Sequence, residues 1–398
     1  MLQRRMTRPT PHPAVLWPLA LVVGAGVFGL SCLTEEAQRR TLNFGTEYAQ
    51  MATEPFALLG KYPHRILGPL VAHALGLDGE RYWMFAHGCA VALLALVFAT
   101  AARFGAGLAG AALLTLVIGF TGTVQIFKGH TGYPDTITFL LLTATILAYR
   151  RPAPFWALQL LNALNHEQVL FFWPWLLWWR RRDPNARWRD DAIGATAVLA
   201  IYVAWRLYVG ARAETQLLTM EHYLGLGYFP VGTLGLAALN VLSTFIWFGL
   251  LPIWVAWHAF ADGWRRAGAG IVLFLICLHA VFGVAHDVYR FTCFLFVPVL
   301  FAGVRLLERP RGALVVGLTG AASAVVIVLQ APVFERIGVA VLVEQTENGP
   351  AVRPDPVMSI VPDVIPAYPV TFAVYGLCVV ATVVIGLAWA RASREAAA

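Results

Sequence analysis

The sequence predicts an all-α protein, a polytopic transmembrane helical bundle, and its composition is the main reason. Hydrophobic residues make up 59% of the chain and charged residues only 13%, with 14 tryptophans. The mean hydropathy is +0.67. A soluble domain of 398 residues has too little interior to bury so much apolar surface. We therefore expect a single integral membrane domain over 1–398, with the lipid bilayer as its solvent.

Apolar runs recur along the whole chain and predict about 10–12 spans. Several runs are shorter than the roughly 20 residues that cross a hydrocarbon core, so some helices should be tilted, re-entrant or shielded. The first run follows several arginines and lacks a small-residue cleavage site, which predicts an uncleaved signal anchor. The runs are 14–32, 82–101, 105–121, 134–149, 153–165, 168–179, 192–210, 234–257, 269–285, 292–306, 313–331 and 370–390.

The positions of Lys and Arg predict the orientation. With a cytoplasmic N-terminus and one crossing per run, cytoplasmic segments hold 18 of the 29 basic residues but only 6 of the 22 acidic ones. This asymmetry is what the positive-inside rule requires. Both termini are then cytoplasmic, and the long loop 33–81 and the Pro-rich loop 332–369 lie outside.

The same rule predicts a helical hairpin between Arg151 and Arg180, because both ends of that segment belong inside. The tip, 165–168, reads "NHEQ". Its legs are about 20 Å long at 1.5 Å per residue, too short to cross the membrane. A carboxylate at that depth needs a cation, a donor or water nearby, which makes Glu167 a candidate catalytic residue and Asn165 and His166 candidate binding residues. A structural cap on the turn is the alternative.

The first outer loop contains "FGTEYAQMATEPF". Glu47 and Glu54 lie seven residues apart, on one face if the stretch is helical. Because Glu47 lies beside the mouth of an apolar bundle, it is a candidate general base. The alternative is a solvated loop charge.

The stretch "KYPHRILGPLVAHALGL" follows. We expect His64 and Arg65 to hold an anionic head group, since an arginine fork donates two hydrogen bonds to a phosphate. Ordinary snorkelling of these side chains is the alternative. Pro63 and Pro69 favour a short re-entrant or interfacial helix over a span.

Two further polar stretches are expected outside, "KGHTGYPD" and "HDVYRFTCFLF". In the second, Asp287 and Arg290 have the i, i+3 spacing of a helical ion pair, and ionisable groups at a membrane boundary are functional candidates. A structural salt bridge is the alternative. Asp287 is the third catalytic candidate, and the remaining binding candidates in these stretches are Lys128, His130, Asp135, His286 and Arg290.

Other chemistries lack their motifs. The five cysteines fall singly and without metal-type spacing, and there is no Walker loop, dinucleotide fingerprint or nucleophile elbow. Internal inverted repeats, typical of many secondary transporters, are not evident. We expect no cofactor and no nucleic-acid partner, while a divalent metal stays open.

The order of "YPHRILGPLVAHAL", "GYPDTITFLLL", "LNHEQVLFFWPWLL" and "HDVYRFTCFLFVPVL" after a long first outer loop resembles the type-C (GT-C) glycosyltransferases of bacteria. The resemblance implies transfer of a sugar from a polyprenyl-phosphate donor to an envelope acceptor at the outer face of the inner (plasma) membrane. It also implies an acidic residue in the first loop. The family pattern places an Asp ahead of "EY", where this chain has Phe44-Gly45-Thr46, so Glu47 is the nearest acid.

Two other functions fit the same membrane organisation. The first is a transporter or flippase for a lipid-linked or anionic solute, and the second is a non-catalytic partner in envelope biosynthesis. A transporter needs polar residues on both sides of the membrane, whereas the predicted inner segments are short and dominated by arginine. This difference favours the enzyme.

Overall fold

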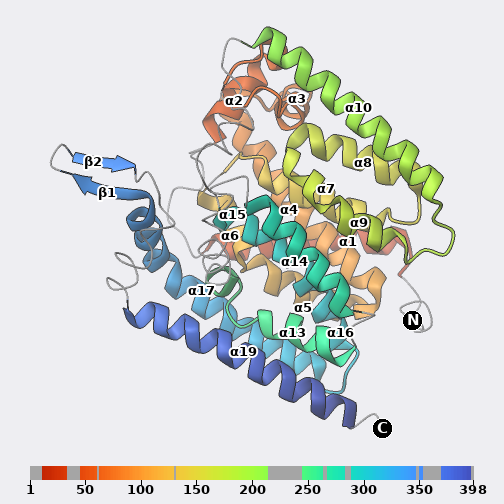
Figure 1. Ribbon diagram of the computed structural model, residues 1–398, viewed down its shortest axis with the longest axis vertical. Coiled ribbons are helices and arrows are strands. Elements are labelled where there is room, and N and C mark those ends of the chain that lie inside the picture. Colours follow the sequence, from red (N-terminus) through yellow and green to blue (C-terminus); the bar gives the residue numbers. More distant parts are fainter. Residues whose placement is uncertain are drawn as a thin grey trace. The chain divides into compact units, whose positions relative to one another are not determined.

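The computed structural model describes residues 11–33, 45–60, 62–129, 131–213, 244–262, 267–282, 288–346, 349–352 and 369–395. Within this part the regular elements are helices, except for one antiparallel hairpin of β1 (Val343–Thr346) and β2 (Gly349–Val352) (Figure 1). The helical class predicted from the sequence is confirmed.

The chain forms two compact units. The first contains residues 1–218 and 307–313, and the second contains 219–306 and 314–398. Whether they act as the single integral domain expected from the composition stays a prediction.

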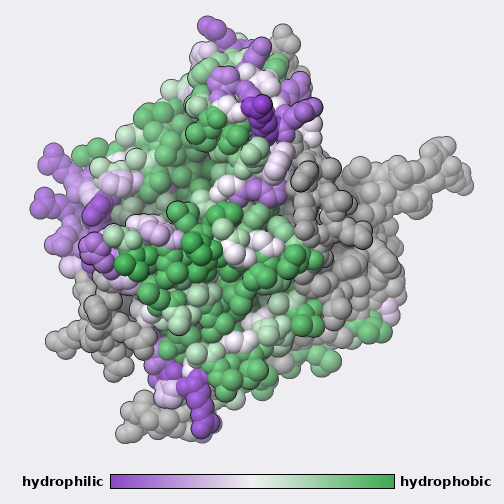
Figure 2. Space-filling model, turned by 180° about the vertical axis from the view of Figure 1, so that it is seen from behind, coloured by the Kyte–Doolittle hydropathy of each residue, from purple (hydrophilic) through white to green (hydrophobic). Residues whose placement is uncertain are grey.

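In the described part, four helical segments are long and apolar enough to cross a membrane. They are α1 (Pro13–Cys32), the segment Gly79–Gly119, α10 (Trp188–Arg212) and the segment Arg290–Leu307. Figure 2 shows hydrophobic residues over broad areas of the surface, as lipid-facing helices require. The protein is thus a helical membrane protein by length and composition of its helices, and the total number of spans stays a prediction.

The segment Gly79–Gly119 is bent back on itself rather than straight. α4 (Tyr82–Ala101) and α5 (Gly107–Gly119) flank a π-helical turn, η6 (Ala102–Ala106). Gly105 has φ 107° and Gly107 has φ 69°, values that glycine adopts without steric cost. The two apolar runs predicted on either side of Arg103 are therefore separate helices, as expected.

The hairpin predicted between the arginine clusters is present. α8 (Pro152–Asn165) begins with a proline at its first position and stops at an extended His166, and η7 (Glu167–Phe172) and α9 (Trp173–Arg180) return. The Trp173 indole donates to Gln159 Oε1 at 2.9 Å, and Arg180 Nη1 donates to the Tyr149 carbonyl at 2.7 Å. The two legs therefore lie side by side and antiparallel.

The loop after α1 folds into short helices. These are α2 (Thr46–Thr53), η4 (Pro55–Ala57), α3 (Leu67–Ala74) and η5 (Gly79–Arg81). α3 has eight residues, so the expectation of a short helix after Pro63 is confirmed. The shared face of Glu47 and Glu54 is not formed, because α2 ends before Glu54, whose φ of −140° is not helical.

α6 (Gly122–Gly129) and α7 (Asp135–Leu147) complete the helices of the first unit. In the second unit, Trp257 and Trp389 pack with ring centroids 5.2 Å apart, which joins α13 to α19. The described helical elements of that unit are α13 (Pro252–Ala261), α14 (Ala269–Phe282), α15 (Val288–Thr292), η9 (Cys293–Leu295), α16 (Phe296–Leu307), α17 (Gly312–Leu342) and α19 (Pro369–Glu395).

One predicted loop boundary is wrong. α17 continues to Leu342 and is followed by β1 and β2, so the segment 332–369 begins with helix and strand rather than with an irregular Pro-rich loop. The physical reason is that residues 333–342 remain largely apolar after Pro332 and extend the helix.

Candidate functional site

Arg65 joins three stretches that are far apart in the sequence. Its Nη2 donates to Glu167 Oε1 at 2.8 Å and its Nε donates to Oε2 at 3.2 Å, a two-pronged contact with the carboxylate. Its Nη1 donates to the Tyr48 hydroxyl at 3.4 Å. The Arg65 side chain is buried. The turn before α3, the hairpin tip and α2 therefore meet at one guanidinium.

The Glu167 carboxylate is surrounded by cationic and imidazole groups, as its depth requires. His64 Nε2 lies 3.3 Å and His166 Nδ1 lies 3.6 Å from Oε2, while 30% of the Glu167 side chain stays exposed. Desolvation alone would raise the pKa of this carboxyl. The Arg65 charge and the two imidazoles outweigh it and hold the pKa well below its usual range. Glu167 is therefore an anion at neutral pH and a weak proton acceptor.

The neighbouring His64 is neutral under the same conditions. Burial lowers the pKa of its imidazole below the ordinary 6.5, although the Glu167 carboxylate acts in the opposite direction. A neutral imidazole beside a carboxylate carries its proton on the nitrogen that faces the carboxylate, here Nε2. Nδ1 is then an acceptor, and it is buried without a hydrogen-bond partner among the described residues.

Helix α10 supplies residues that the sequence interpretation missed. The Trp205 indole donates to the His64 carbonyl at 2.8 Å, and Arg206 Nη1 donates to the Tyr202 hydroxyl at 3.3 Å. Tyr202, Trp205 and Arg206 lie inside the apolar run 192–210, for which the sequence predicted a span and no site residue. An arginine within such a run was the available signal, because charged residues in spans are rare and commonly functional.

Aromatic rings enclose the Arg65 guanidinium. Its central carbon lies 4.1 Å from the centroid of the Tyr62 ring, a cation–π geometry. The ring of Tyr48 meets that of Tyr133 edge to face at 5.3 Å. Tyr133 belongs to "GYPD", so this fourth stretch also reaches the site.

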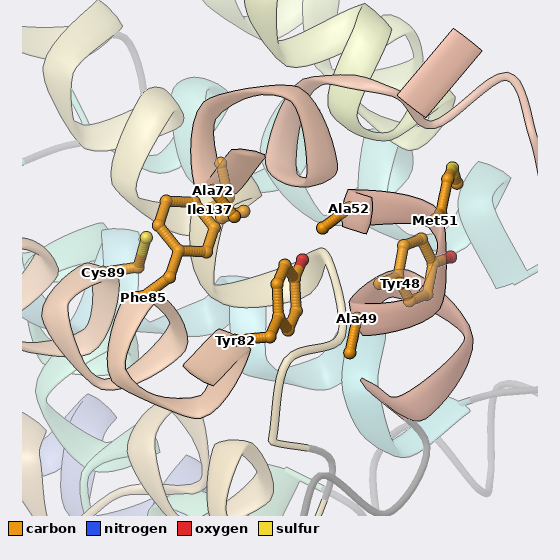
Figure 3. Close-up of a cluster of buried hydrophobic side chains, with 9 residues drawn as sticks. All are labelled: Tyr48, Ala49, Met51, Ala52, Ala72, Tyr82, Phe85, Cys89 and Ile137. Carbon is orange, nitrogen blue, oxygen red and sulfur yellow. The ribbon is translucent and has the colours of Figure 1, made fainter. Parts of the chain in front are cut away.

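The site rests on an apolar cluster from α2, α3, α4 and α7 (Figure 3). Gly68 lies against it, where an added Cβ would stand 2.9 Å from Ile137 Cδ1 and 3.2 Å from the Tyr82 hydroxyl. The backbone of α3 thus approaches its neighbours closely, which fixes the turn that carries Arg65. The members of the cluster are Tyr48, Ala49, Met51, Ala52, Ala72, Tyr82, Phe85, Cys89 and Ile137.

Asn165 connects the hairpin tip to the start of α7. Its side-chain amide donates to the Pro134 carbonyl at 2.8 Å and to Thr138 Oγ1 at 2.9 Å. Both donor positions are thus used within the protein, and Asn165 is placed to position Glu167 two residues later.

The other predicted site residues are distributed as follows. Glu47 is exposed on α2, next to Tyr48, and Asp135 is buried at the first position of α7. Arg290 is buried on α15 in the second unit. The side chain of Lys128 and the residues His130, His286 and Asp287 lie outside the described residues. Their assigned roles, like those of the residues above, stay predictions.

No three His, Cys, Asp or Glu side chains of the described part are arranged to hold a metal ion. The positive charge next to Glu167 comes from Arg65 instead.

Known proteins add nothing to this picture, because no protein-family model, curated protein or solved structure matches the chain. The fold and the site define a helical membrane protein with a partly exposed carboxylate held by an arginine and a histidine.

Proposed function

We propose that this protein is a membrane glycosyltransferase that moves a sugar from a polyprenyl-phosphate donor to an envelope acceptor. The reaction would take place at the outer face of a bacterial inner membrane, with both termini in the cytoplasm. The proposal extends the resemblance of the sequence to the type-C superfamily.

One observation carries the proposal. Four polar stretches of the first unit that the charge distribution assigns to the outside converge around Arg65 and Glu167. They are "EY", "YPHR", "GYPD" and "NHEQ". An enzyme needs its polar groups gathered at one place, and a lipid-phosphate donor suits this position because its chain can stay in the bilayer.

The chemistry would be a single inverting displacement. The acceptor hydroxyl oxygen attacks the anomeric carbon, the bond from that carbon to the phosphate oxygen breaks, and the phosphate departs with the bonding electrons. Glu47 would accept the hydroxyl proton, since it is exposed and adjacent to Tyr48, which contacts Arg65. Glu167 suits a different role, because its lowered pKa makes it a poor base. It would hold Arg65 in place to balance the charge of the departing phosphate.

Glu47→Gln tests this assignment. The purified variant should keep its fold but lose 10²–10⁴-fold in turnover, as is typical of general-base loss. The measurement is release of polyprenyl phosphate from a panel of polyprenyl-phosphate sugars. Glu54→Gln is the matched control, an exposed glutamate just beyond the same helix, and it should stay within a few-fold of the parent.

Three results would change the proposal. If Glu47→Gln turns over normally while Glu167→Gln is inactive, the base belongs to the hairpin tip. If the parent protein releases polyprenyl phosphate from none of the donors, the enzyme reading fails and the non-catalytic partner gains support. If lipid-linked sugars cross proteoliposome membranes without being consumed, the protein is a flippase.

One observation favours this last alternative. A buried polar seam runs between α7 and α8. There Gln159 donates to the Thr145 hydroxyl, Asn162 donates to the Thr138 carbonyl, and Asn165 donates to the Thr138 hydroxyl. Polar groups continued along a helix pair could line a path. These donors, however, bond to neighbouring groups of the protein, as expected for polar contacts that hold membrane helices together.

A further inference from the structure

Arg206 differs from Arg65 in that no carboxylate of the described residues is paired with it. Its only hydrogen bond in the described part is the one to the Tyr202 hydroxyl, and its side chain is half-buried. Arg65, by contrast, is bound by Glu167 through two of its nitrogens. Glu167 is paired with Arg65, so Arg206 adds a positive charge that no carboxylate of the described residues offsets.

Arg206 lies at the depth of lipid head groups if α10 spans the membrane. It follows Trp188, the first residue of α10, by 18 positions, which corresponds to about 27 Å along a helix. A hydrocarbon core is about 30 Å thick. With the charged start of α10 at one surface, Arg206 reaches the opposite one.

The surface of α10 beside Arg206 is apolar and, among the described residues, exposed. Leu199, Val203 and Leu207 are between 43% and 70% exposed. Such a surface is compatible with lipid chains, so a chain can lie against the helix while its polar end meets the arginine.

Helix α10 is fixed to the rest of the cluster next to Arg206. The hydrogen bond from Trp205 to the His64 carbonyl ties the residue before Arg206 to the turn that carries the imidazole. The Arg206 charge is near enough to contribute to the lowered pKa of His64.

We propose that Arg206, together with Tyr202, forms a binding site for the phosphate group of a membrane lipid. The guanidinium donates to phosphate oxygens, the Tyr202 hydroxyl donates a further hydrogen bond, and the chain of the lipid stays on the apolar surface of α10. The assignment rests on the proposed function only for the identity of the lipid, because binding requires no turnover.

The test is calorimetric titration of the full chain, purified in an uncharged detergent, with farnesyl phosphate. Farnesol lacks the phosphate and inorganic phosphate lacks the chain, so both should bind at least about tenfold more weakly. Arg206→Gln should weaken the binding of farnesyl phosphate at least about tenfold, as expected when a charge-assisted hydrogen bond is lost. Tyr202→Phe, which removes only a hydroxyl, should weaken the binding of farnesyl phosphate a few-fold. This second variant keeps the test valid if Arg206→Gln does not fold.

Arg212→Gln is the matched control, because Arg212 is an exposed arginine of the same helix that stacks on Tyr208. It should bind as the parent does. Equal weakening by Arg206→Gln and Arg212→Gln, or unchanged binding in both Arg206→Gln and Tyr202→Phe, would overturn the site. Inorganic phosphate binding as tightly as farnesyl phosphate would also overturn it.

A parallel titration with dioctanoyl phosphatidylglycerol shows which kind of lipid the phosphate belongs to. If farnesyl phosphate binds more tightly, the site supports the proposed polyprenyl donor. If phosphatidylglycerol binds more tightly and Arg206→Gln still abolishes it, the lipid site stands while its connection with glycosyl transfer fails.

Discussion

Arg65 is the residue on which the candidate site depends most directly. It holds the Glu167 carboxylate through two nitrogens, contacts the Tyr48 hydroxyl with the third and lies over the Tyr62 ring. A lysine could keep the charge but not this planar geometry. Removing one partner of a buried ion pair commonly lowers the free energy of unfolding by about 3–5 kcal/mol. Because Glu167 is partly exposed, the loss for this pair is below that range.

The titration of His64 and Glu167 predicts that acid destabilises the protein. His64 lies in a turn and Glu167 begins η7, both outside the four long apolar segments. Both have folded-state pKa values below their ordinary values of 6.5 and 4.5. The folded state therefore binds fewer protons than the unfolded state, so stability decreases as pH falls. The apparent Tm in detergent should be constant above about pH 7, decrease below 6.5 and decrease again below 4.5.

His64→Gln separates the two steps of this profile. Without the imidazole, the decrease that begins near 6.5 should become shallower, while the decrease below 4.5 should remain. An unchanged profile in His64→Gln would show that other groups titrate in the upper range and would contradict the assignment.

At the scale of elements, the start of α2 is held against the turn before α7. A Cβ at Gly45 would lie 2.0 Å from the Thr131 carbonyl oxygen and 2.8 Å from Gly132 Cα. Both are backbone atoms, which cannot rotate away as a side chain can. Gly45→Ala should therefore push α2 away from this turn, lower the apparent Tm and move Tyr48 from Arg65. Thermal unfolding in detergent and donor turnover are the measurements.

Gly26→Ala provides the control for this prediction. A Cβ at Gly26 in α1 would meet nothing within 4 Å, and alanine favours a helix over glycine by about 1 kcal/mol. Its Tm should be equal to or above that of the parent. Equal Tm values for the two variants would mean that the contact at Gly45 does not hold α2 in place.

At the scale of the whole molecule, the charge distribution predicts that α2 faces the outside and that the start of α10 faces the cytoplasm. The hairpin tip itself is unsuited to a labelling test, because Gln168 is buried. Gln50 on α2 and Arg187 before α10 are both exposed. In a background with all five cysteines replaced by alanine, a cysteine at Gln50 should react with a membrane-impermeant thiol reagent in intact cells.

A cysteine at Arg187 should react only after the cells are permeabilised. The matched pair controls for expression and reactivity, since each thiol must label fully in detergent. Labelling of the Arg187 position alone in intact cells would reverse the topology and move the candidate site to the cytoplasmic side.

The sequence alone determined the class of the protein and the main local elements. The share of apolar residues predicted membrane-spanning helices, the two arginine clusters predicted the hairpin, and the prolines around α3 predicted a short helix. These features depend on composition and on neighbours in the chain, which a sequence displays directly. The extension of α17 was missed because a proline that usually ends a helix lies within it.

Only the tertiary structure decided which charged residues face each other. The sequence indicated that Glu167 needs a cation nearby, but Arg65, about a hundred positions earlier, became its partner only through folding. Arg206 looked like part of an ordinary apolar run until α10 brought it beside Tyr202 and the His64 turn. The physical reason is that ion pairs and hydrogen bonds depend on distances of a few ångströms between side chains, and positions along the chain do not specify those distances.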